Sequence, residues 1–334
     1  MKKNSHSFLL TARDKEVVFD LLNRYGIKFT SRGKGKKTLY GKLCYIFQAD
    51  FRILKLAIKF KPDIFISFAS PYAAQISWLL RKPHIAFTDT EHAKLGNLAF
   101  IPFSNNILTP SCFNSYLGKN HIKFNSYMEL CYLHPKYFIP TPNVLDSLGV
   151  IKGEKYIILR FVSWDASHDI GQGGLDYETK VKLVEKLSRH AKVFISSEYE
   201  LHSELKKYQI FIPPEKMHDV LSFASLYIGE GATMASECAM LGIPAIYVNS
   251  LSAGTLEEQE KYGLLYCLRD SKGVLEKALQ LLKTSNLKKD YEIRRKKMLS
   301  DKIDVTAFMV WFVENYPNSE KIMKEKPNYQ YNFK

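Results

Sequence analysis

The residues best suited to chemistry lie in the segment 226–248, where a buried strand, a glycine-containing turn, a short helix and a second buried strand are predicted. Such a turn brings free backbone N–H groups and the positive end of a helix to one point, an arrangement that binds phosphate. Thr233 is expected at the helix start, and Glu237 lies one turn later on the same face. With a diphosphate at Thr233, the Glu237 carboxylate could accept hydrogen bonds from ribose hydroxyls. The pattern predicts a nucleotide-sugar site.

A second group of polar residues follows the apolar strand predicted at 156–162. The candidate substrate-binding residues of this loop are Ser163, Trp164, Asp165 and His168. A loop at a strand end that can donate, accept and titrate is a plausible wall of a binding cleft. In the alternative interpretation, Asp165 caps a turn and Trp164 packs. The Asp-x-x-His-Asp spacing matches no standard metal site, so no metal is expected.

Asp89, Glu91 and His92 follow the strand predicted at 84–88. A carboxylate beside a histidine offers groups that can titrate near neutrality, so these three are candidates for general acid–base catalysis. The alternative is that they cap turns and form hydrogen bonds across a cleft between domains.

A basic loop, residues 31–37, is followed by the aromatic residues Tyr40, Tyr45, Phe47 and Phe51. It could dock on anionic lipid or on a lipid-diphosphate acceptor, which would give a peripheral contact with a membrane. The alternative, which we prefer, is a solvated basic loop.

The composition bounds the class of protein. The 334 residues suffice for two domains, and 46% of them are apolar. The net charge of +14 suits anionic ligands such as nucleotide diphosphates or anionic lipid, whereas no nucleic-acid-binding motif is present. Five cysteines without C-x-x-C pairing, and no apolar run near the roughly 20 residues of a spanning helix, favour a cytoplasmic location, with contact to the inner face of the membrane left open.

Short β-rich runs alternate with helical periodicity along the chain, which predicts an α/β fold with mainly parallel sheets. A proline cluster at 134–147 suggests a linker. We therefore expect an N-terminal Rossmann-like domain at 1–140, a C-terminal Rossmann-like domain at 141–302, and a helix and tail at 303–334 that could pack back on the first domain. The predicted strands are 7–12, 27–30, 64–68, 84–88, 106–108, 156–162, 193–197, 210–212, 226–228, 245–248 and 264–268. The predicted helices are 14–25, 44–60, 177–190, 215–224, 233–241, 255–262, 273–283 and 305–315.

Five segments carry a resemblance to a known family: 87–93, 160–171, 194–198, 229–237 and 302–306. On these the chain resembles the prokaryotic family catalogued as domain of unknown function 354, which is similar to non-hydrolysing UDP-N-acetylglucosamine 2-epimerases and GT-B glycosyltransferases. The resemblance implies a GT-B-like fold, with two Rossmann-like domains facing a cleft.

The resemblance also implies site residues. Aligned through Leu241-Gly-Ile-Pro244, it places phosphate contacts at Gly231, Ala232 and Thr233, beside Met234, and a ribose contact at Glu237. It places Asp89 and Glu91 opposite the reacting sugar and puts Ser70 in another cleft-lining segment. Glu230 adds negative charge beside the turn, so its side chain must point away if phosphate is to bind. Family members begin with a further strand, loop and helix, so we expect an in-frame extension upstream of Met1, without which two strand edges would be unpaired.

The function expected from these observations is a GT-B-type enzyme that acts on a nucleotide-diphosphate sugar without a cofactor. A glycosyltransferase of surface polysaccharide or glycolipid synthesis, with a saccharide or lipid-linked acceptor, is the first hypothesis. The alternatives are a UDP-sugar 2-epimerase-like enzyme and a non-catalytic sugar-nucleotide-binding protein.

Overall fold

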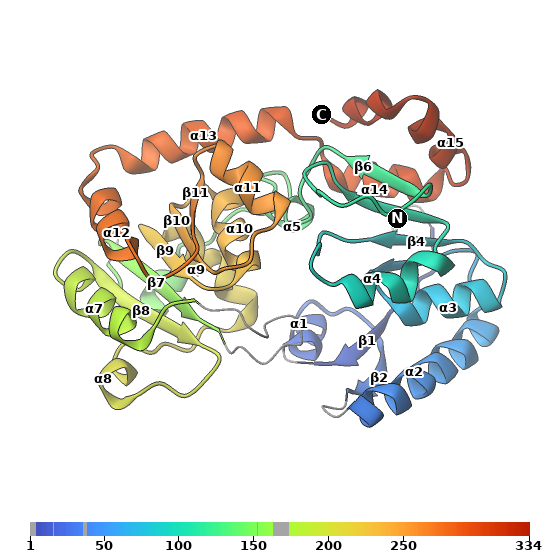
Figure 1. The fold of residues 1–334 in the computed structure, drawn as a ribbon, viewed down its shortest axis with the longest axis horizontal. Helices are drawn as coiled ribbons and strands as arrows, with labels where there is room; N and C mark the ends of the chain where they lie inside the picture. The colour runs from blue at the N-terminus through green and yellow to red at the C-terminus, as the bar shows by residue number, and fades with distance from the viewer. Residues whose placement is uncertain (1–4, 16, 36–38, 152, 163–173) are drawn as a thin grey trace. The chain divides into compact units, whose positions relative to one another are not determined.

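The computed structural model describes residues 5–15, 17–35, 39–151, 153–162 and 174–334. The chain divides into two compact units, which we treat separately (Figure 1): unit 1 comprises residues 1–124 and 306–333, and unit 2 comprises residues 125–305. The division falls earlier than the predicted domain boundary at residue 140. The physical reason is that residues 125–141 bond within unit 2, as Tyr132 does to Glu237 and the Thr141 N–H to the Asp219 carboxylate.

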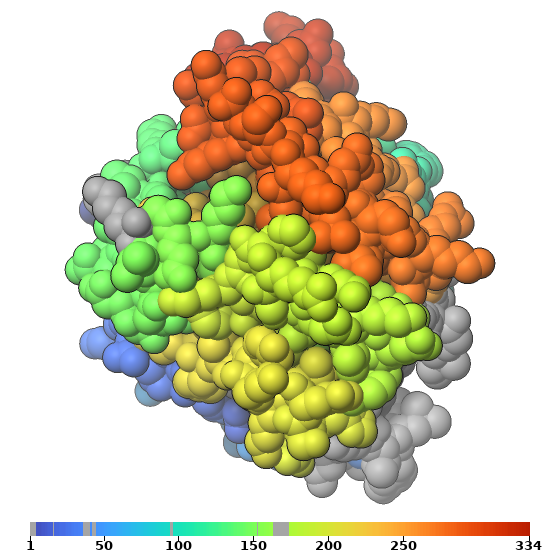
Figure 2. Space-filling view, turned by 90° about the vertical axis from the view of Figure 1, so that its left-hand side faces the viewer, coloured from blue at the N-terminus to red at the C-terminus, as the bar shows by residue number. Residues whose placement is uncertain are grey.

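Unit 2 is built on one parallel five-stranded sheet of order β11-β10-β9-β7-β8. Every residue of β9 and β10 is buried, because parallel strands covered by helices on both faces are apolar throughout. On one face of the sheet α12 packs beside α7, and Figure 2 shows them in orange and yellow-green. The strands are β7 (Tyr156–Phe161), β8 (Lys192–Ser197), β9 (Leu226–Gly229), β10 (Ala245–Val248) and β11 (Leu265–Leu268).

Helices of unit 2 follow the strands in alternation. The α7 helix begins after Asp176, whose carboxylate accepts the Thr179 N–H at 2.7 Å, and α10 ends at Gly242, whose φ of 74° suits glycine. The helices are α5 (Leu130–Leu133), α6 (Val144–Ser147), α7 (Tyr177–Leu187), α8 (Ser203–Lys206), α9 (Met217–Phe223), α10 (Ala232–Leu241), α11 (Gly254–Lys261), α12 (Val274–Lys283) and α13 (Leu287–Asp301), with a 3-10 turn η3 (Pro214–Lys216).

Unit 1 holds two separate parallel sheets, β1-β2 and β3-β4-β5-β6. The residues of β4 and β5 are all buried, whereas Ile66 and Phe68 of the edge strand β3 are 42% and 53% exposed. The strands are β1 (Thr11–Asp14), β2 (Thr30–Lys34), β3 (Phe65–Phe68), β4 (His84–Phe87), β5 (Asn106–Pro110) and β6 (His121–Phe124).

The helices of unit 1 come from both ends of the chain. Phe308 of α14 is fully buried, with its ring 6.0 Å from that of Phe124 in β6, so residues 306–333 belong to this unit. The helices are α1 (Val18–Arg24), α2 (Leu39–Phe60), α3 (Pro71–Leu79), α4 (Lys94–Phe100), α14 (Val305–Glu314) and α15 (Asn318–Glu325), with 3-10 segments η2 (Ile101–Phe103) and η4 (Pro327–Phe333). None of the helices in the described ranges is both long and apolar enough to cross a membrane.

The predicted α/β class with parallel sheets is confirmed, and three local predictions are wrong. Residues 210–212 form no strand, because prolines 213 and 214 follow and the segment makes a single bridge, Gln209 with Ile195. The first two strands lie further along the chain than predicted: β1 begins at Thr11 and not at residue 7, and β2 begins at Thr30 and not at residue 27.

Candidate functional site

The first candidate site is the α10 turn, which we define as Glu230, Gly231 and the first three residues of α10, Ala232–Met234. It follows directly on the carboxyl end of β9. Gly231 is the N-cap, with φ −92° and ψ 122°, and no side chain caps the helix. Thr233 is therefore the second residue of the helix and not its cap, which corrects the prediction that the helix starts there.

The amides of this helix start have no acceptor among the described residues. In the part of the chain that the structure describes, no acceptor faces the N–H groups of Ala232, Thr233 or Met234. Thr233 is exposed, and Gly231, Ala232 and Met234 are half-buried. Three open N–H groups at the positive end of a ten-residue helix can bind an oxyanion.

The side chain of Glu230 points into unit 2, so its charge does not face the α10 turn. Its side chain is fully buried, and its carboxylate accepts the N–H groups of Val162 at 3.1 Å and Leu175 at 2.9 Å. The ammonium of Lys180 in α7 lies 3.3 Å from Oε1 and also 4.7 Å from the centre of the Phe161 ring. The negative charge beside the turn is thus neutralised by an internal partner.

The backbone of the turn is held as well. The side-chain amide of Asn249, one residue beyond β10, donates to the Glu230 carbonyl at 3.1 Å. The Glu230 carboxylate and carbonyl are therefore both fixed, and the open amides that follow are preorganised. The sequence analysis missed Asn249 and Lys180. Asn249 could have been found because ligands of parallel sheets lie at the carboxyl ends of strands.

Glu237 lies one turn into α10 and is 8% exposed. Its Oε1 accepts the Tyr132 hydroxyl at 3.0 Å and lies 3.0 Å from Nε2 of His218. The rings of Tyr132 and His218 stack at 5.4 Å. No partner of Oε2 is found among the described residues, and this atom is not among the fully buried unpaired ones. One carboxylate oxygen is held by unit 2 and the other can accept from a ligand.

Tyr132 and His218 reach Glu237 from α5 and α9, and no spacing in the sequence indicates that they do. The predicted residues Ser163, Trp164, Asp165 and His168 lie outside the described residues. Val162 comes directly before the undescribed residues 163–173 and Leu175 comes two residues after them, and the N–H groups of both donate to Glu230.

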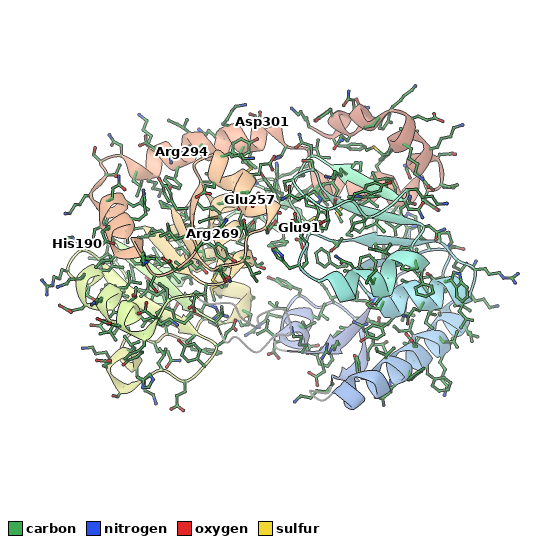
Figure 3. All side chains as sticks on the ribbon, in the orientation of Figure 1. Glu91, His190, Glu257, Arg269, Arg294 and Asp301 are labelled. Carbon is green, nitrogen blue, oxygen red and sulfur yellow. The ribbon has the colours of Figure 1, made fainter. Side chains whose placement is uncertain are left out.

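In unit 1, Asp89, Glu91 and His92 share the loop between β4 and α4. Asp89 accepts the Thr90 hydroxyl at 3.1 Å, and burial raises the pKa of its carboxyl. Glu91, labelled in Figure 3, accepts the N–H of Asn114 at 2.9 Å and so ties this loop to the one after β5. His92 is exposed. Of the three, Asp89 best suits a general base, since a raised pKa brings a carboxyl closer to neutrality.

Ser70 follows β3 and caps α3. Its hydroxyl accepts the Ala73 N–H at 3.5 Å, and its own N–H donates to Ser67 Oγ at 3.1 Å. These bonds explain its position without a ligand, so a cleft-lining role stays a prediction.

A second hollow of unit 2 lies at the other end of its sheet. This cavity of about 1200 Å³ is bordered by residues at the amino ends of strands, among them Tyr156 of β7, Ser225 before β9 and Pro244 before β10. We do not assign it to the ligand of the α10 turn, because ligands of parallel sheets bind at the carboxyl ends. Among the described residues, no three histidine, cysteine or acidic side chains could together hold a metal ion.

Comparison with known proteins identifies the family. The family model described as "Protein of unknown function (DUF354)" matches residues 1–317, so the chain belongs to this family. Among curated proteins, the chain is similar to the uncharacterized protein MJ0665 of Methanocaldococcus jannaschii, with 26% identity over 256 residues that cover 73% of this chain and 74% of that protein.

Solved structures show the fold. The UDP-GlcNAc 2-epimerase of Methanocaldococcus jannaschii matches with a TM-score of 0.59 and 13% identity, over 89% of this chain and 93% of that one. The glycosyltransferase SsfS6 of Streptomyces sp. SF2575, complexed with thymidine diphosphate, matches with a TM-score of 0.57 and 12% identity, over 94% and 92%. The GT-B-like fold expected from the resemblance is thereby confirmed.

Proposed function

We propose that this member of the DUF354 family is an enzyme that holds the diphosphate of a nucleotide sugar at the α10 turn. The observation that carries the proposal is the set of three open N–H groups of Ala232, Thr233 and Met234, beside a glutamate whose charge is neutralised inside the unit. An anion at this point meets the positive end of a helix, and the Glu230 charge beside it is paired with Lys180.

The proposed reaction is glycosyl transfer. Oε2 of Glu237 would accept from the ribose, while Tyr132 and His218 fix the carboxylate through Oε1. The amides at the helix start would stabilise the negative charge that develops on the departing diphosphate. Within unit 1, Asp89 is the candidate for a general base, because burial raises the pKa of its carboxyl. The acceptor we propose is a saccharide or a lipid-linked saccharide of surface polysaccharide or glycolipid synthesis.

The second candidate is a 2-epimerase-like reaction, favoured by the epimerase structure that matches with a TM-score of 0.59. In that case the same turn would hold a diphosphate that is eliminated and added back, and no acceptor would be needed. Binding of the sugar nucleotide without turnover is the third candidate.

The experiment is a titration of the full chain with UDP, TDP and GDP, followed by thermal unfolding and calorimetry. We expect one of them to raise the unfolding temperature, and Glu237→Gln to weaken its binding at least about tenfold, since a hydrogen bond to a charged group contributes roughly 1.5–3 kcal/mol. Glu276→Gln is the matched control, because Glu276 is exposed in the first turn of α12. Equal effects of the two variants, or no stabilisation by any of the nucleotides, would contradict the proposal.

Turnover then separates the three candidates. With UDP-N-acetylglucosamine as probe, a transferase releases UDP only when an acceptor saccharide is added. An epimerase converts the sugar nucleotide alone. A binding protein is stabilised by the probe and forms no product.

A further inference from the structure

Unit 1 contains a cluster of three arginines that neither the family description nor the proposed function uses. Arg13 lies in β1, Arg32 in β2 and Arg52 in α2. The Arg13 guanidinium lies 5.3 Å from the centre of the Tyr45 ring, and that of Arg32 lies 5.3 Å from the Tyr72 ring. The two rings meet edge to face at 5.8 Å. The cluster is thus held by two aromatic side chains in contact.

The backbone of the segment 30–35 leaves space for the guanidinium groups of Arg13 and Arg52. The register of β1 and β2 shifts between Ala12 and Asp14, opposite Arg32 and Gly33, and such an irregularity re-aims side chains. Gly33 has a φ of 87°, and a Cβ there would overlap Nη1 of Arg52; a Cβ at Gly35 would overlap the guanidinium of Arg13. Residues with side chains would displace both cations, so the two glycines build the cluster.

The cluster has no counter-ion in the described part of the chain. None of the three arginines forms an ion pair there, and Arg52 donates instead to the carbonyl of Arg32 at 2.7 Å. The Nε atoms of Arg13 and Arg32 are buried without an acceptor. Burial lowers the pKa of the Arg32 guanidinium, and Arg13 adds to this through charge repulsion.

An acidic neighbour does not supply the missing charge. Asp50, on α2, makes no ion pair with these arginines among the described residues, and its buried Oδ1 lacks a partner. Burial raises the pKa of its carboxyl to about 6. Burying cations without a partner costs free energy, so the site is better satisfied when an anion is bound.

We propose that Arg13, Arg32 and Arg52 form an oxyanion site that takes a phosphate group of a ligand of unit 1. A phosphate ester carries about −1.5 to −2 charges at pH 7 and three acceptor oxygens, which suits more than one guanidinium, whereas a carboxylate carries a single charge. The planar fork of arginine matches phosphate with two parallel hydrogen bonds.

The position in the fold agrees with a ligand site. Arg13 is the last residue but one of β1, Arg32 lies at the centre of the parallel neighbour β2, and Tyr72 lies in the first turn of α3, two residues beyond the Ala69–Ser70 turn after β3. Ligands of α/β units bind at such strand ends. The site belongs to unit 1, so it does not depend on the nucleotide proposed for unit 2.

The test is hydrogen–deuterium exchange of the full chain with two probes, inorganic diphosphate and vesicles of phosphatidylglycerol, with phosphatidylcholine vesicles as the neutral reference. We expect slower exchange in peptides that cover residues 30–35 and 45–52. Protection by diphosphate assigns a soluble phosphorylated ligand, and protection by the anionic vesicles alone assigns a lipid headgroup. Peptides that cover residues 229–240 report the α10 turn separately, so failure of one site is distinguishable from failure of the other.

Variants locate the effect. Arg13→Gln and Arg32→Gln should each weaken binding of the protecting probe at least tenfold. Arg81→Gln, the same charge change just beyond the end of α3, should leave that binding unchanged. Gly35→Ala tests the geometry without a charge change and should also weaken binding. The proposal is overturned if neither probe protects residues 30–35, or if the arginine and glycine variants bind as well as the native protein.

Discussion

The two units use the same alternation of strands and helices and differ in how well their sheets are covered. In unit 2 the strand β9 lies between β7 and β10 and is entirely buried. In unit 1 the strand β3 stands at the edge of its sheet, with Ile66 and Phe68 about half exposed. Parallel strands are normally covered on both faces, so β3 departs from the rule that β9 follows.

This difference indicates how rigidly each unit can hold a ligand. The α10 turn follows a strand fixed on both sides, and Glu230 ties it to the residue after β7, to α7 and to the residue after β10. The arginine cluster of unit 1 combines a two-stranded sheet with one residue of α2, and Tyr45 and Tyr72 lie against two of its guanidinium groups. Unit 2 offers fixed amides, and unit 1 offers long cationic side chains.

The largest effect is expected from breaking the internal ion pair of unit 2. Lys180→Met leaves the buried Glu230 carboxylate without its cation and should lower the free energy of unfolding by about 3–5 kcal/mol. Lys182→Met, on the same helix, removes only the exposed pair with Glu178 and should cost about 1 kcal/mol or less. Denaturant unfolding, monitored by hydrogen exchange in peptides of unit 2, measures both losses in the free energy of unfolding. Similar losses in the two variants would contradict the role of Lys180.

Truncation of equivalent apolar residues compares the two sheets directly. Ile228→Ala in β9 should cost about 2–5 kcal/mol, because the side chain is fully buried. Ile66→Ala in β3 should cost about 1 kcal/mol, because 42% of the residue is already exposed. Each variant is measured by the exchange rates of its own unit. An equal cost would mean that β3 is covered in solution.

Acid should weaken unit 1 through His84, which is fully buried between Ser67 and Ser104. Burial lowers the pKa of His84 from 6.5 to about 4, so the folded state stays neutral where the unfolded chain binds a proton. Stability is therefore full above about pH 6.5 and falls as the pH drops toward 4, by up to about 3 kcal/mol.

The slope of unfolding free energy against pH checks this prediction. His84→Asn should reduce the slope in unit 1 between pH 6.5 and 4, and His121, whose pKa burial also lowers to about 4, should supply the slope that remains. His202→Asn, an exposed histidine of unit 2, is the control and should not change it. Asp50, whose pKa is raised to about 6, acts in the opposite direction in the same range, since its folded state holds a proton that the unfolded state releases.

The smallest effect is expected at the bond that positions Glu237. Tyr132→Phe removes one hydrogen bond to Oε1 and keeps the ring that stacks on His218. Nucleotide binding should weaken by a factor of about 5, the equivalent of roughly 1 kcal/mol. Calorimetry measures it, and Tyr137→Phe, whose hydroxyl bonds Asp304 instead, serves as the control. Unchanged binding in Tyr132→Phe would exclude this positioning role.

The sequence predicted the elements whose signal is local. Strands β7, β9 and β10 are continuous apolar runs, and the order of strand, glycine and helix at 226–241 needs only neighbouring residues. β6 was missed because exposed Lys123 and half-buried His121 interrupt its apolar pattern, and α13 was missed because most of its residues are polar. The sequence did not predict that β1 and β2 form a sheet separate from β3, because the pairing of strands depends on residues far apart in the chain. The further strand expected from the family resemblance stays a prediction.

The site was predictable only in part for the same reason. Gly231, Thr233 and Glu237 lie close together in sequence, so their spacing places them on one helix start. Tyr132 meets Glu237 across 105 positions and Asn249 meets Glu230 across 19, through the packing of separate elements. Arg13, Arg32 and Arg52 come together in the same way, through the packing of β1, β2 and α2, whereas the sequence predicted only a basic loop at 31–37.

Glu230 shows why the formal charges in a sequence window say little about the field that a bound molecule experiences. The window 226–241 contains two glutamates and no lysine or arginine, so a tally of residues would reject it for an anion. The compensating ammonium comes from position 180, through the interior, and what remains at the surface is the dipole of α10. Searches for similar sites in other chains should therefore weigh an acidic residue after such a strand by what lies beneath it.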